Sequence, residues 1–374
     1  MSQIITQMSE AADQLYKYIS DKEINKLFLV CGRSYESLSI SSYMNRIFKK
    51  NDIKIVFFRD FKPNPEYESV ANGIRIFKDN CCDAIMAVGG GSAIDVAKCI
   101  KAYINADDSK CFLEQPVISN NIPFIAIPTT AGTGSEATKF AVVYYKGEKQ
   151  SVEDKSCIPD FVVLDPDTLI GLSDYQKKAT LLDVLCHAVE SFWSVNSTDK
   201  SRSYSKKALG LILSNYKEYV ETGSSESRKN MMLASNIAGK AINITKTTAG
   251  HAMCYKLTSL YDIPHGYAAA MCNAELFPYM VNNTQKCIDK RGAEYLNKMF
   301  RDLALSMNAD TLEKAVEKFA KIVRELIPEA PVATKKDIDM LTTSVNVSRL
   351  KNNPIKLEPD VIGQLYKNIL KTDK

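Results

Sequence analysis

The first 165 residues alternate short, continuous hydrophobic runs with segments of helical periodicity. Helix-like stretches such as Glu68–Asn80 and Ala93–Asn105 separate the runs. Continuous apolar strands that alternate with helices are typical of a mostly parallel sheet covered on both faces. We therefore expect an α/β domain over residues 1–165, with strands at Lys26–Cys31, Ile53–Phe58, Ala84–Val88, Pro123–Ile127 and Phe161–Leu164.

The pattern changes from Asp165 onward, where helical periodicity dominates. Ser173 and Gln176 have the spacing of a capping box, and a long helical pattern follows them through Trp193. Asp310 and Glu313 give a similar start signal. We expect an all-α domain over residues 166–374, with further helices at about Ser201–Glu221, Ser225–Ile244, Thr311–Ile327 and Asp360–Leu370.

Composition excludes several classes of protein. The net charge of +4 is small for 374 residues. It does not indicate a nucleic-acid-binding protein, for which a basic stripe is expected. No apolar stretch approaches the ~18 residues that span a bilayer, and residues 1–10 lack the features of a secretion signal. Ten irregularly spaced cysteines form neither a disulfide framework nor CxxC zinc pairs. We expect reduced thiols and a cytoplasmic protein.

A glycine-rich turn follows the third predicted strand. Gly89, Gly90, Gly91 and Ser92 lie between that strand and the helical segment that begins at Ala93. Glycines let the backbone approach a pyrophosphate, and the helix N-terminus offers free N–H groups. The spacing is not GxGxxG, and a plain tight turn fits the same residues.

A second loop of small and hydroxylated residues follows the next strand, over Pro128–Glu136. A flexible surface loop is one interpretation of it. Two phosphate-compatible loops after neighbouring strands favour a dinucleotide over a mononucleotide.

The chain has only three histidines, and all of them fall in the predicted helical domain. Asp183 and His187 are four residues apart on a predicted helix and share one face. His251 and His265 follow within short motifs. Each histidine alone suits a core or surface role. One carboxylate with three imidazoles is a competent ligand set for a divalent metal such as iron or zinc.

These motifs together resemble the iron-containing (group III) alcohol dehydrogenase family, whose fold is related to dehydroquinate synthase. The matching stretches are Gly89–Lys98, Pro128–Glu136, Asp183–Glu190, His251 with Tyr261–Gly266, and Phe61–Pro65. They occur in family order over most of the chain. The resemblance implies a nucleotide-binding α/β domain, a helical domain and an active site in the cleft between them.

The resemblance also implies a chemistry and a set of site residues. Fe2+, or Zn2+ in its place, would be held by Asp183, His187, His251 and His265 and would polarise an aldehyde that accepts hydride from a nicotinamide. Four retained ligands argue against the glycerol dehydrogenase branch. A homodimer is expected by analogy. The implied cofactor-binding residues are Gly32, Arg33, Ser34, Asn64, Gly89, Gly90, Gly91, Ser92, Asp95, Thr129, Thr130, Thr133, Ser135 and Lys149.

One position departs from the family pattern. Many members carry a further histidine four residues after the third ligand, where this chain has Tyr255. A tyrosine can donate a proton to a nascent alkoxide, and Lys256 beside it could assist or could bind an anionic substrate. We therefore take Tyr255 and Lys256 as candidate catalytic residues.

The first strand suggests which nicotinamide cofactor is used. NAD-specific members of the family usually have an aspartate directly after it, whereas Gly32-Arg33-Ser34 stands here. Arg33 could pair with a 2′-phosphate or simply face solvent. We expect NADPH to be preferred over NADH.

The substrate expected from the sequence is a short, anionic aldehyde. Lys139, Lys256 and Arg349 are cations that could clamp a phosphonate. Thr247–Tyr261 resembles the branch that reduces phosphonoacetaldehyde to 2-hydroxyethylphosphonate. A reductase or dehydrogenase of neutral short-chain aldehydes and alcohols, of the butanol or propanediol type, is the alternative. A dehydroquinate synthase-like lyase and a non-catalytic nucleotide-binding regulator are further alternatives.

Overall fold

The computed structural model describes residues 3–327 and 329–372. The chain divides into two compact units. The first contains the chain up to Leu172 together with Gly223–Met232, and the second contains Ser173–Thr222 and the chain from Leu233 onward. Helix α7 (Ser225–Thr245) begins in the first unit and continues in the second.

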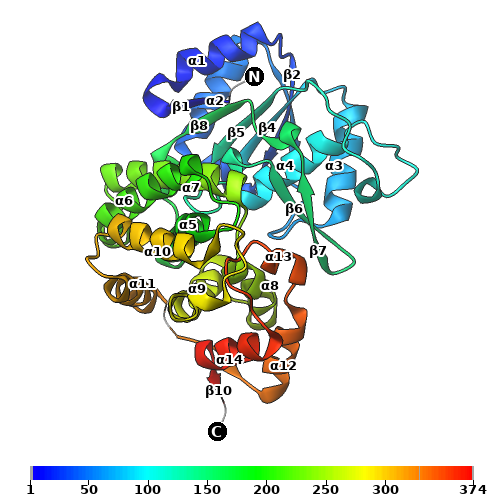
Figure 1. The fold of residues 1–374 in the computed structure, drawn as a ribbon. Helices are drawn as coiled ribbons and strands as arrows, with labels where there is room; N and C mark the ends of the chain where they lie inside the picture. Colours follow the sequence, from blue (N-terminus) through cyan, green and yellow to red (C-terminus); the bar gives the residue numbers. More distant parts are fainter. Residues whose placement is uncertain (1–2, 328, 373–374) are drawn as a thin grey trace. The chain divides into compact units, whose positions relative to one another are not determined.

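The first unit is built on a six-stranded parallel sheet (Figure 1). Its strand order is β1-β8-β5-β4-β2-β3. All five strands expected from the sequence are present, with ends within one residue of the expected ones. The additional strand β1 is short and largely exposed, so its hydrophobic pattern is weak. The bounds are β1 (Ile4–Gln7), β2 (Lys26–Cys31), β3 (Lys54–Phe58), β4 (Ala84–Gly89), β5 (Phe124–Pro128) and β8 (Phe161–Leu164).

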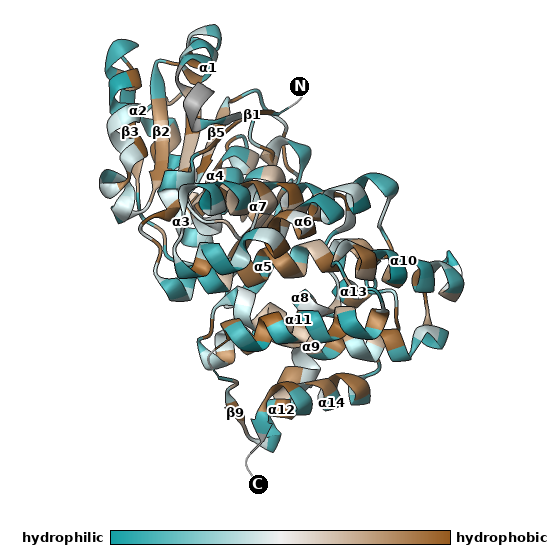
Figure 2. Ribbon diagram, turned by 90° about the vertical axis from the view of Figure 1, so that its left-hand side faces the viewer, coloured by the Kyte–Doolittle hydropathy of each residue, from teal (hydrophilic) through white to brown (hydrophobic). Residues whose placement is uncertain are grey.

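Helices cover both faces of this sheet. Alternate residues of a strand point to opposite faces. In β2, Leu27 and Leu29 pack with α1 (Met8–Asp21) and α2 (Ser39–Lys50). Phe28 and Val30 pack with α3 (Tyr67–Asp79) and α4 (Gly91–Tyr103). Figure 2 shows the hydrophobic colour along β2 and β5 that this two-sided burial requires. The expected α/β architecture is confirmed.

An antiparallel hairpin in the first unit was not expected from the sequence. It consists of β6 (Phe140–Tyr145) and β7 (Glu148–Glu153). Lys146 and Gly147 connect the strands with φ of 52° and 77°, the backbone of a tight two-residue hairpin turn. The sequence Glu148–Glu153 is mostly polar, so it carries no hydrophobic signal.

Short 3-10 turns lie at Arg33–Ser37, Phe112–Glu114, Ser135–Ala137, Lys155–Cys157, Pro166–Leu169 and Thr284–Lys286.

Over the residues that the structure describes, the second unit is mainly helical, as expected, and contains a parallel pair of two-residue strands, β9 (Val332–Ala333) and β10 (Lys371–Thr372). Its core contains packed aromatic rings, with Trp193 tilted by 44° against Phe277 and the ring centroids 5.2 Å apart. Among the described residues, no helix has the length and hydropathy needed to cross a membrane. Besides α7, the helices are α5 (Asp174–Trp193), α6 (Asp199–Glu221), α8 (Ala249–Tyr261), α9 (His265–Asn282), α10 (Gly292–Ser306), α11 (Leu312–Leu326), α12 (Lys335–Ser344), α13 (Val347–Leu350) and α14 (Pro359–Ile369).

Local start signals explain two of these helices. The capping box of Ser173 and Gln176 is present at the start of α5. At α11 the N-cap is Thr311, whose hydroxyl accepts the Lys314 N–H, and not Asp310. The sequence interpretation placed the start signal at Asp310, one residue too early. Threonine is also a preferred N-cap residue, and Thr311 is the N-cap here.

Candidate functional site

Asp183 and His187 lie one turn apart in the middle of α5, and both side chains are buried. His251 is in the first turn of α8, and His265 is the first residue of α9. The Nε2 atoms of the three imidazoles surround one oxygen, Asp183 Oδ1. The distances to that oxygen are 3.4 Å from His251, 3.7 Å from His187 and 4.0 Å from His265. The structure therefore brings together all four expected metal ligands.

Two glycines beside the ligands allow this convergence. A methyl group on Gly266 would lie 1.9 Å from the carbonyl oxygen of Ala179 on α5. Glycine therefore lets the start of α9, and with it His265, approach the helix that carries Asp183. A methyl group on Gly250 would lie 2.3 Å from the side-chain amide of Asn273, next to His251. Both positions require the absence of a side chain.

The donor set fits a divalent transition metal. Ligand atoms of Asp183, His187 and His251 all lie within 4.8 Å of one another, and these residues are buried. His265 has a side chain that is 36% exposed, so it lies on the open side of the group. Imidazole nitrogen with carboxylate oxygen suits iron and zinc. An open side is what a catalytic site needs to admit a substrate.

The charges of the group are strongly coupled. Burial alone would raise the pKa of Asp183, but the surrounding imidazoles, His187 first, lower it. Burial alone would lower the pKa of His251, but the carboxylates of Glu190 and Asp183 raise it to about 9. In the absence of a metal, the carboxylates and imidazolium thus compensate one another's charge.

Glu190 is a buried residue of this site to which the sequence interpretation gave no role. Its Oε1 lies 2.6 Å from Nδ1 of His251 and accepts a hydrogen bond of 2.7 Å from Asn273. Its Oε2 accepts hydrogen bonds from the backbone N–H and the hydroxyl of Thr248. Burial opposes its ionisation, yet His251 and these donors lower the pKa of Glu190 to about 2.

Helical spacing could have indicated Glu190. Asp183, His187 and Glu190 stand at positions i, i+4 and i+7, which is one face of a helix. Asn273 and Thr248 have no comparable signal, because they come from other helices and loops.

Tyr255 lies against the exposed ligand. Its ring stacks on the imidazole of His265, with centroids 5.6 Å apart and planes at 14°. Arg349, at the end of α13, donates a hydrogen bond of 2.6 Å to the phenol oxygen and places its guanidinium carbon 4.6 Å from the ring centroid. Burial, partly offset by Arg349, raises the pKa of Tyr255, so the phenol stays protonated. Arg349 and Tyr255 are therefore close to the metal ligands.

The two lysines expected to bind substrate have different surroundings. Lys256 follows Tyr255 on α8 and is half-buried. Lys139 belongs to the first unit, where its ammonium forms a 2.7 Å salt bridge with Glu153 on β7. Arg349 reaches the ligand group through Tyr255, whose phenol it hydrogen-bonds and whose ring stacks on His265.

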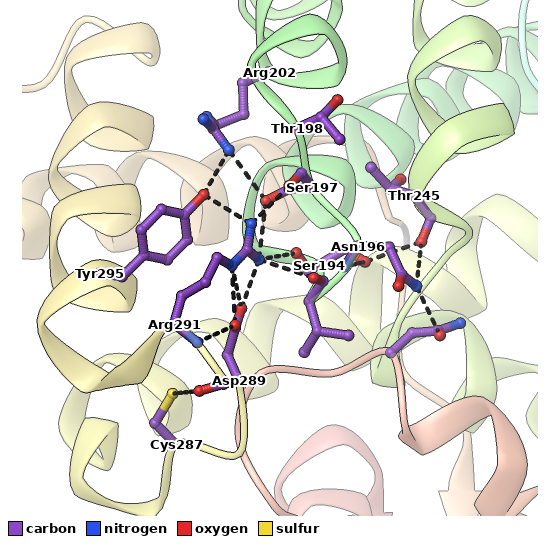
Figure 3. Close-up of polar contacts among 12 residues, drawn as sticks. Ser194, Asn196, Ser197, Thr198, Arg202, Thr245, Cys287, Asp289, Arg291 and Tyr295 are labelled. Atoms are coloured by element: carbon purple, nitrogen blue, oxygen red, sulfur yellow. Dashed lines mark hydrogen bonds and ion pairs between the residues drawn. The ribbon is translucent and has the colours of Figure 1, made fainter.

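A polar network fixes the loop that follows α5, the helix that carries Asp183 and His187 (Figure 3). The guanidinium of Arg291 donates to the carbonyl oxygens of Ser194, Val195 and Ser197. Asp289 accepts from that guanidinium with both carboxylate oxygens, and the guanidinium carbon lies 4.1 Å from the centroid of the Tyr295 ring. A cation at the C-terminal end of α5 also complements the helix dipole.

The two phosphate-compatible loops of the first unit touch each other. The backbone N–H of Thr129 donates to the carbonyl of Gly89 at 3.0 Å. A methyl group on Gly91 would lie 2.8 Å from Cγ2 of Thr133, so the glycine turn packs closely on the second loop. Helix α4 begins at Gly91, and its first N–H groups are those of Gly91, Ser92 and Ala93. Thr130 likewise adjoins the turn, beside Gly90.

Asp95 and Ser135, both expected to bind the cofactor, contact each other. The Ser135 hydroxyl donates to Oδ1 of Asp95 at 2.7 Å, and the Val142 N–H donates to Oδ2 at 3.1 Å. Burial raises the pKa of Asp95, and Lys98 and, more weakly, Lys149 on β7 are among the groups that oppose this shift. The hydrogen bonds of Asp95 therefore connect α4 to the second loop and to β6.

Lys98 is a fully buried lysine that the sequence interpretation left without a role. Its ammonium donates to the carbonyls of Ser135, Thr138 and Phe140 at 2.6, 2.8 and 2.7 Å. These acceptors come from the end of the second loop and the start of β6. Lys98 therefore connects the second loop to α4, the helix that follows the glycine-rich turn.

The other residues expected to bind the cofactor follow strands β2 and β3 and lie in loops. Gly32 caps the 3-10 turn that contains Arg33 and Ser34, and both of these residues are exposed. Asn64 is exposed and has a φ of 59°. Within the same turn, the Glu36 carboxylate is bound by Arg59 from the end of β3.

Comparison with known proteins identifies the family. The family model described as iron-containing alcohol dehydrogenase matches residues 2–166, and that of the C-terminal part of the Fe-containing family matches residues 177–370. Alcohol dehydrogenase 4 of Schizosaccharomyces pombe is 30% identical over 97% of this chain and 86% of its own length.

Two further comparisons concern length and fold. Aldehyde-alcohol dehydrogenase 2 of Entamoeba histolytica is 29% identical over 85% of this chain, yet the chain spans only 39% of its length. The crystal structure of sulfoacetaldehyde reductase from Bifidobacterium kashiwanohense, in complex with NAD+, has a TM-score of 0.86. It is 24% identical and covers 99% of this chain and 98% of its own, so it shows the fold.

Proposed function

Because the chain belongs to the iron-containing alcohol dehydrogenase family, we propose that it is a metal-dependent oxidoreductase of small aldehydes and primary alcohols. One observation carries the proposal: the Nε2 atoms of three imidazoles lie 3.4, 3.7 and 4.0 Å from one carboxylate oxygen, Asp183 Oδ1. In the reductive direction, an aldehyde gains a hydride from NAD(P)H and a proton, which yields the alcohol and NAD(P)+.

Each residue of the site has a distinct task in this proposal. Asp183, His187, His251 and His265 hold Fe2+, or Zn2+ in its place. The bound cation supplies Lewis acidity toward the aldehyde oxygen. Tyr255, stacked on His265, keeps a proton on its phenol oxygen next to the ligand that faces the opening. Arg349 orients that phenol through its hydrogen bond.

For the substrate, we propose a short anionic aldehyde, with phosphonoacetaldehyde as the leading candidate and 2-hydroxyethylphosphonate as its product. The support is the position of Arg349, whose guanidinium adjoins the Tyr255–His265 stack. One of its nitrogens donates to the phenol, and a guanidinium has further N–H groups that can bind a phosphonate. Lys256, the next residue after Tyr255, adds positive charge on the same helix.

A neutral short-chain aldehyde is the second candidate. The observation that favours it is the salt bridge between Lys139 and Glu153, which already neutralises one of the three cations assigned to substrate.

For the cofactor, we propose that NADPH is preferred. The support is that Glu36, the one carboxylate in the turn after β2, is engaged by Arg59, while Arg33 in that turn is exposed. An exposed arginine with a neutralised acidic neighbour favours a 2′-phosphate. A higher kcat/KM with NADH than with NADPH would contradict this preference.

The test of the proposed function is NAD(P)H oxidation by the metal-loaded protein with a panel of aldehydes. Phosphonoacetaldehyde is compared with propionaldehyde and butyraldehyde, each with Fe2+ and with Zn2+. We expect the anionic aldehyde to give the highest kcat/KM. A His251→Ala variant should lose most bound metal and nearly all turnover, and full activity in that variant would refute the site.

A further inference from the structure

We propose that Glu190 is a positioning residue that fixes the tautomer of His251, so that its Nε2 lone pair is directed at the metal. This inference deepens the proposed function and rests on it. It assigns a role to a buried carboxylate that does not itself reach the group of Nε2 atoms.

The geometry defines which atom of His251 carries hydrogen. Nδ1 of His251 lies 2.6 Å from Oε1 of Glu190. An ionised carboxylate can only accept hydrogen bonds, so Nδ1 must carry the hydrogen. Nε2 of a neutral imidazole then has a free lone pair, and this is the atom that lies 3.4 Å from Asp183 Oδ1. A carboxylate that accepts from the far nitrogen is a common support of metal-binding histidines.

Three other donors hold Glu190 in place. Oε1 faces His251, and Oε2 is bound by Thr248. Asn273 donates to Oε1, beside His251. Thr248, the residue before α8, donates to Oε2 through its N–H and its hydroxyl. The indole N–H of Trp193 in turn donates to the Thr248 hydroxyl at 3.0 Å, which leaves that hydroxyl oriented toward Glu190.

Gly250 belongs to the same arrangement. A methyl group there would overlap all three terminal atoms of the Asn273 amide, at 2.3 to 2.4 Å. Because Gly250 directly precedes His251, the glycine lets the Asn273 amide reach the oxygen that His251 also uses.

These contacts predict what happens in Glu190→Gln. The backbone N–H of Thr248 can only donate, so the glutamine must turn its amide oxygen toward Thr248. Its NH2 group then faces Nδ1 of His251. The imidazole can accept that hydrogen bond only if its own hydrogen moves to Nε2, which removes the lone pair that binds the metal. The substitution also removes one of two negative charges near a divalent cation.

The first test is metal affinity, measured by competition of Zn2+ and Co2+ with a chelator. We expect Glu190→Gln to weaken binding by about 10- to 100-fold. The control is Asp289→Asn, the same acid-to-amide change at another buried carboxylate, which pairs with Arg291 and has no contact with the ligand group. It should lower the melting temperature while metal affinity stays within about threefold of the wild type. Equal losses of affinity in the two variants would overturn the proposal, as would unchanged affinity in Glu190→Gln.

A second test needs no variant of Glu190 and so holds even if that variant misfolds. The chain has three histidines, so the 15N NMR spectrum of Zn2+-loaded, histidine-labelled protein contains three imidazoles. The His251 ring is identified by its absence in His251→Gln. We expect its hydrogen on Nδ1, and a hydrogen on Nε2 would overturn the proposal. If the wild-type protein binds neither metal, the proposed function fails as well; normal wild-type binding with an unaffected Glu190→Gln refutes only this inference.

Discussion

The guanidinium of Arg349 lies over the ring of Tyr255, 4.6 Å from its centroid, and donates to its phenol oxygen at 2.6 Å. These residues are 94 positions apart in the chain. The same tyrosine ring stacks on His265. An imidazole from the proposed ligand set, a proton-bearing phenol and a guanidinium thus form one continuous stack.

Replacing Arg349 should separate anionic from neutral substrates. A hydrogen bond from a charged donor to an anion contributes roughly 1.5–3 kcal/mol, so Arg349→Ala should raise KM for phosphonoacetaldehyde about 10- to 100-fold. KM for propionaldehyde should change less than about threefold on the same reasoning. Arg349→Lys should recover only part of the loss, because lysine lacks the planar fork. Steady-state kinetics on both aldehydes give the comparison, and equal effects on the two would indicate a role in Tyr255 placement alone.

Replacing Tyr255 by Phe should affect turnover more than binding. The phenylalanine ring keeps the stack on His265 but loses the phenol proton. If the phenol donates the proton, kcat should fall by about 100-fold, within the usual range for a general acid, with little change in KM. Metal content measured by atomic emission should stay at the wild-type level. A wild-type kcat in Tyr255→Phe would assign the proton to another group, and Lys256→Met is the next variant to examine.

Gly266→Ala should be destabilising because its methyl group has no room. The clash with the Ala179 carbonyl would displace α9 from α5 and move His265, at a cost of about 3 kcal/mol. Gly210 on α6 is a matched control, since a methyl group there meets nothing within 4 Å. Gly210→Ala should stabilise the protein by up to about 1 kcal/mol through helix propensity. Urea denaturation measures both changes, and a neutral Gly266→Ala would show that α9 can shift freely.

Lys98→Met should weaken nucleotide binding. Without its ammonium, three backbone carbonyls of the second loop and β6 lose their donor, and the loop against Gly89–Gly91 loses its anchor. We expect the Kd for NADPH, followed by fluorescence, to rise about tenfold or more, the equivalent of one charged hydrogen bond. Lys101→Met is the control, because Lys101 is also buried on α4 but bonds Asn120 and Ile122. If Lys98→Met and Lys101→Met both bind NADPH as tightly as the wild-type protein, Lys98 contributes to stability alone.

Metal binding should be coupled to proton release. Glu190 and Asp183 raise the pKa of His251 to about 9 against the effect of burial, so its imidazole is protonated at pH 7 in the metal-free protein. A ligand must lose this proton, so affinity should rise about tenfold per pH unit from neutral pH and level off above about 9. Calorimetry of Zn2+ binding in buffers of different ionisation enthalpy measures the protons released. Zero protons released at pH 7 would contradict the raised pKa.

The hydrophobic pattern predicted the sheet of the first unit because its central strands β2, β4, β5 and β8 are buried on both faces. Runs such as Leu27–Cys31 and Ala84–Val88 are apolar throughout, and each is a strand in the structure. The hairpin of Phe140–Tyr145 and Glu148–Glu153 was missed, since its second strand is mostly polar and is stabilised by pairing with the first.

By itself, the sequence determined the alternation of strands and helices, and the ligand types at Asp183, His187, His251 and His265. These follow from periodicities that act over a few residues and from chemistry that each side chain carries alone. Only the tertiary structure decided that Glu190 meets His251, Thr248 and Asn273, that Lys98 holds the second loop, and that Arg349 meets Tyr255. Those pairs lie 37 to 94 residues apart, and their approach depends on how whole helices pack, down to the missing methyl groups at Gly250 and Gly266.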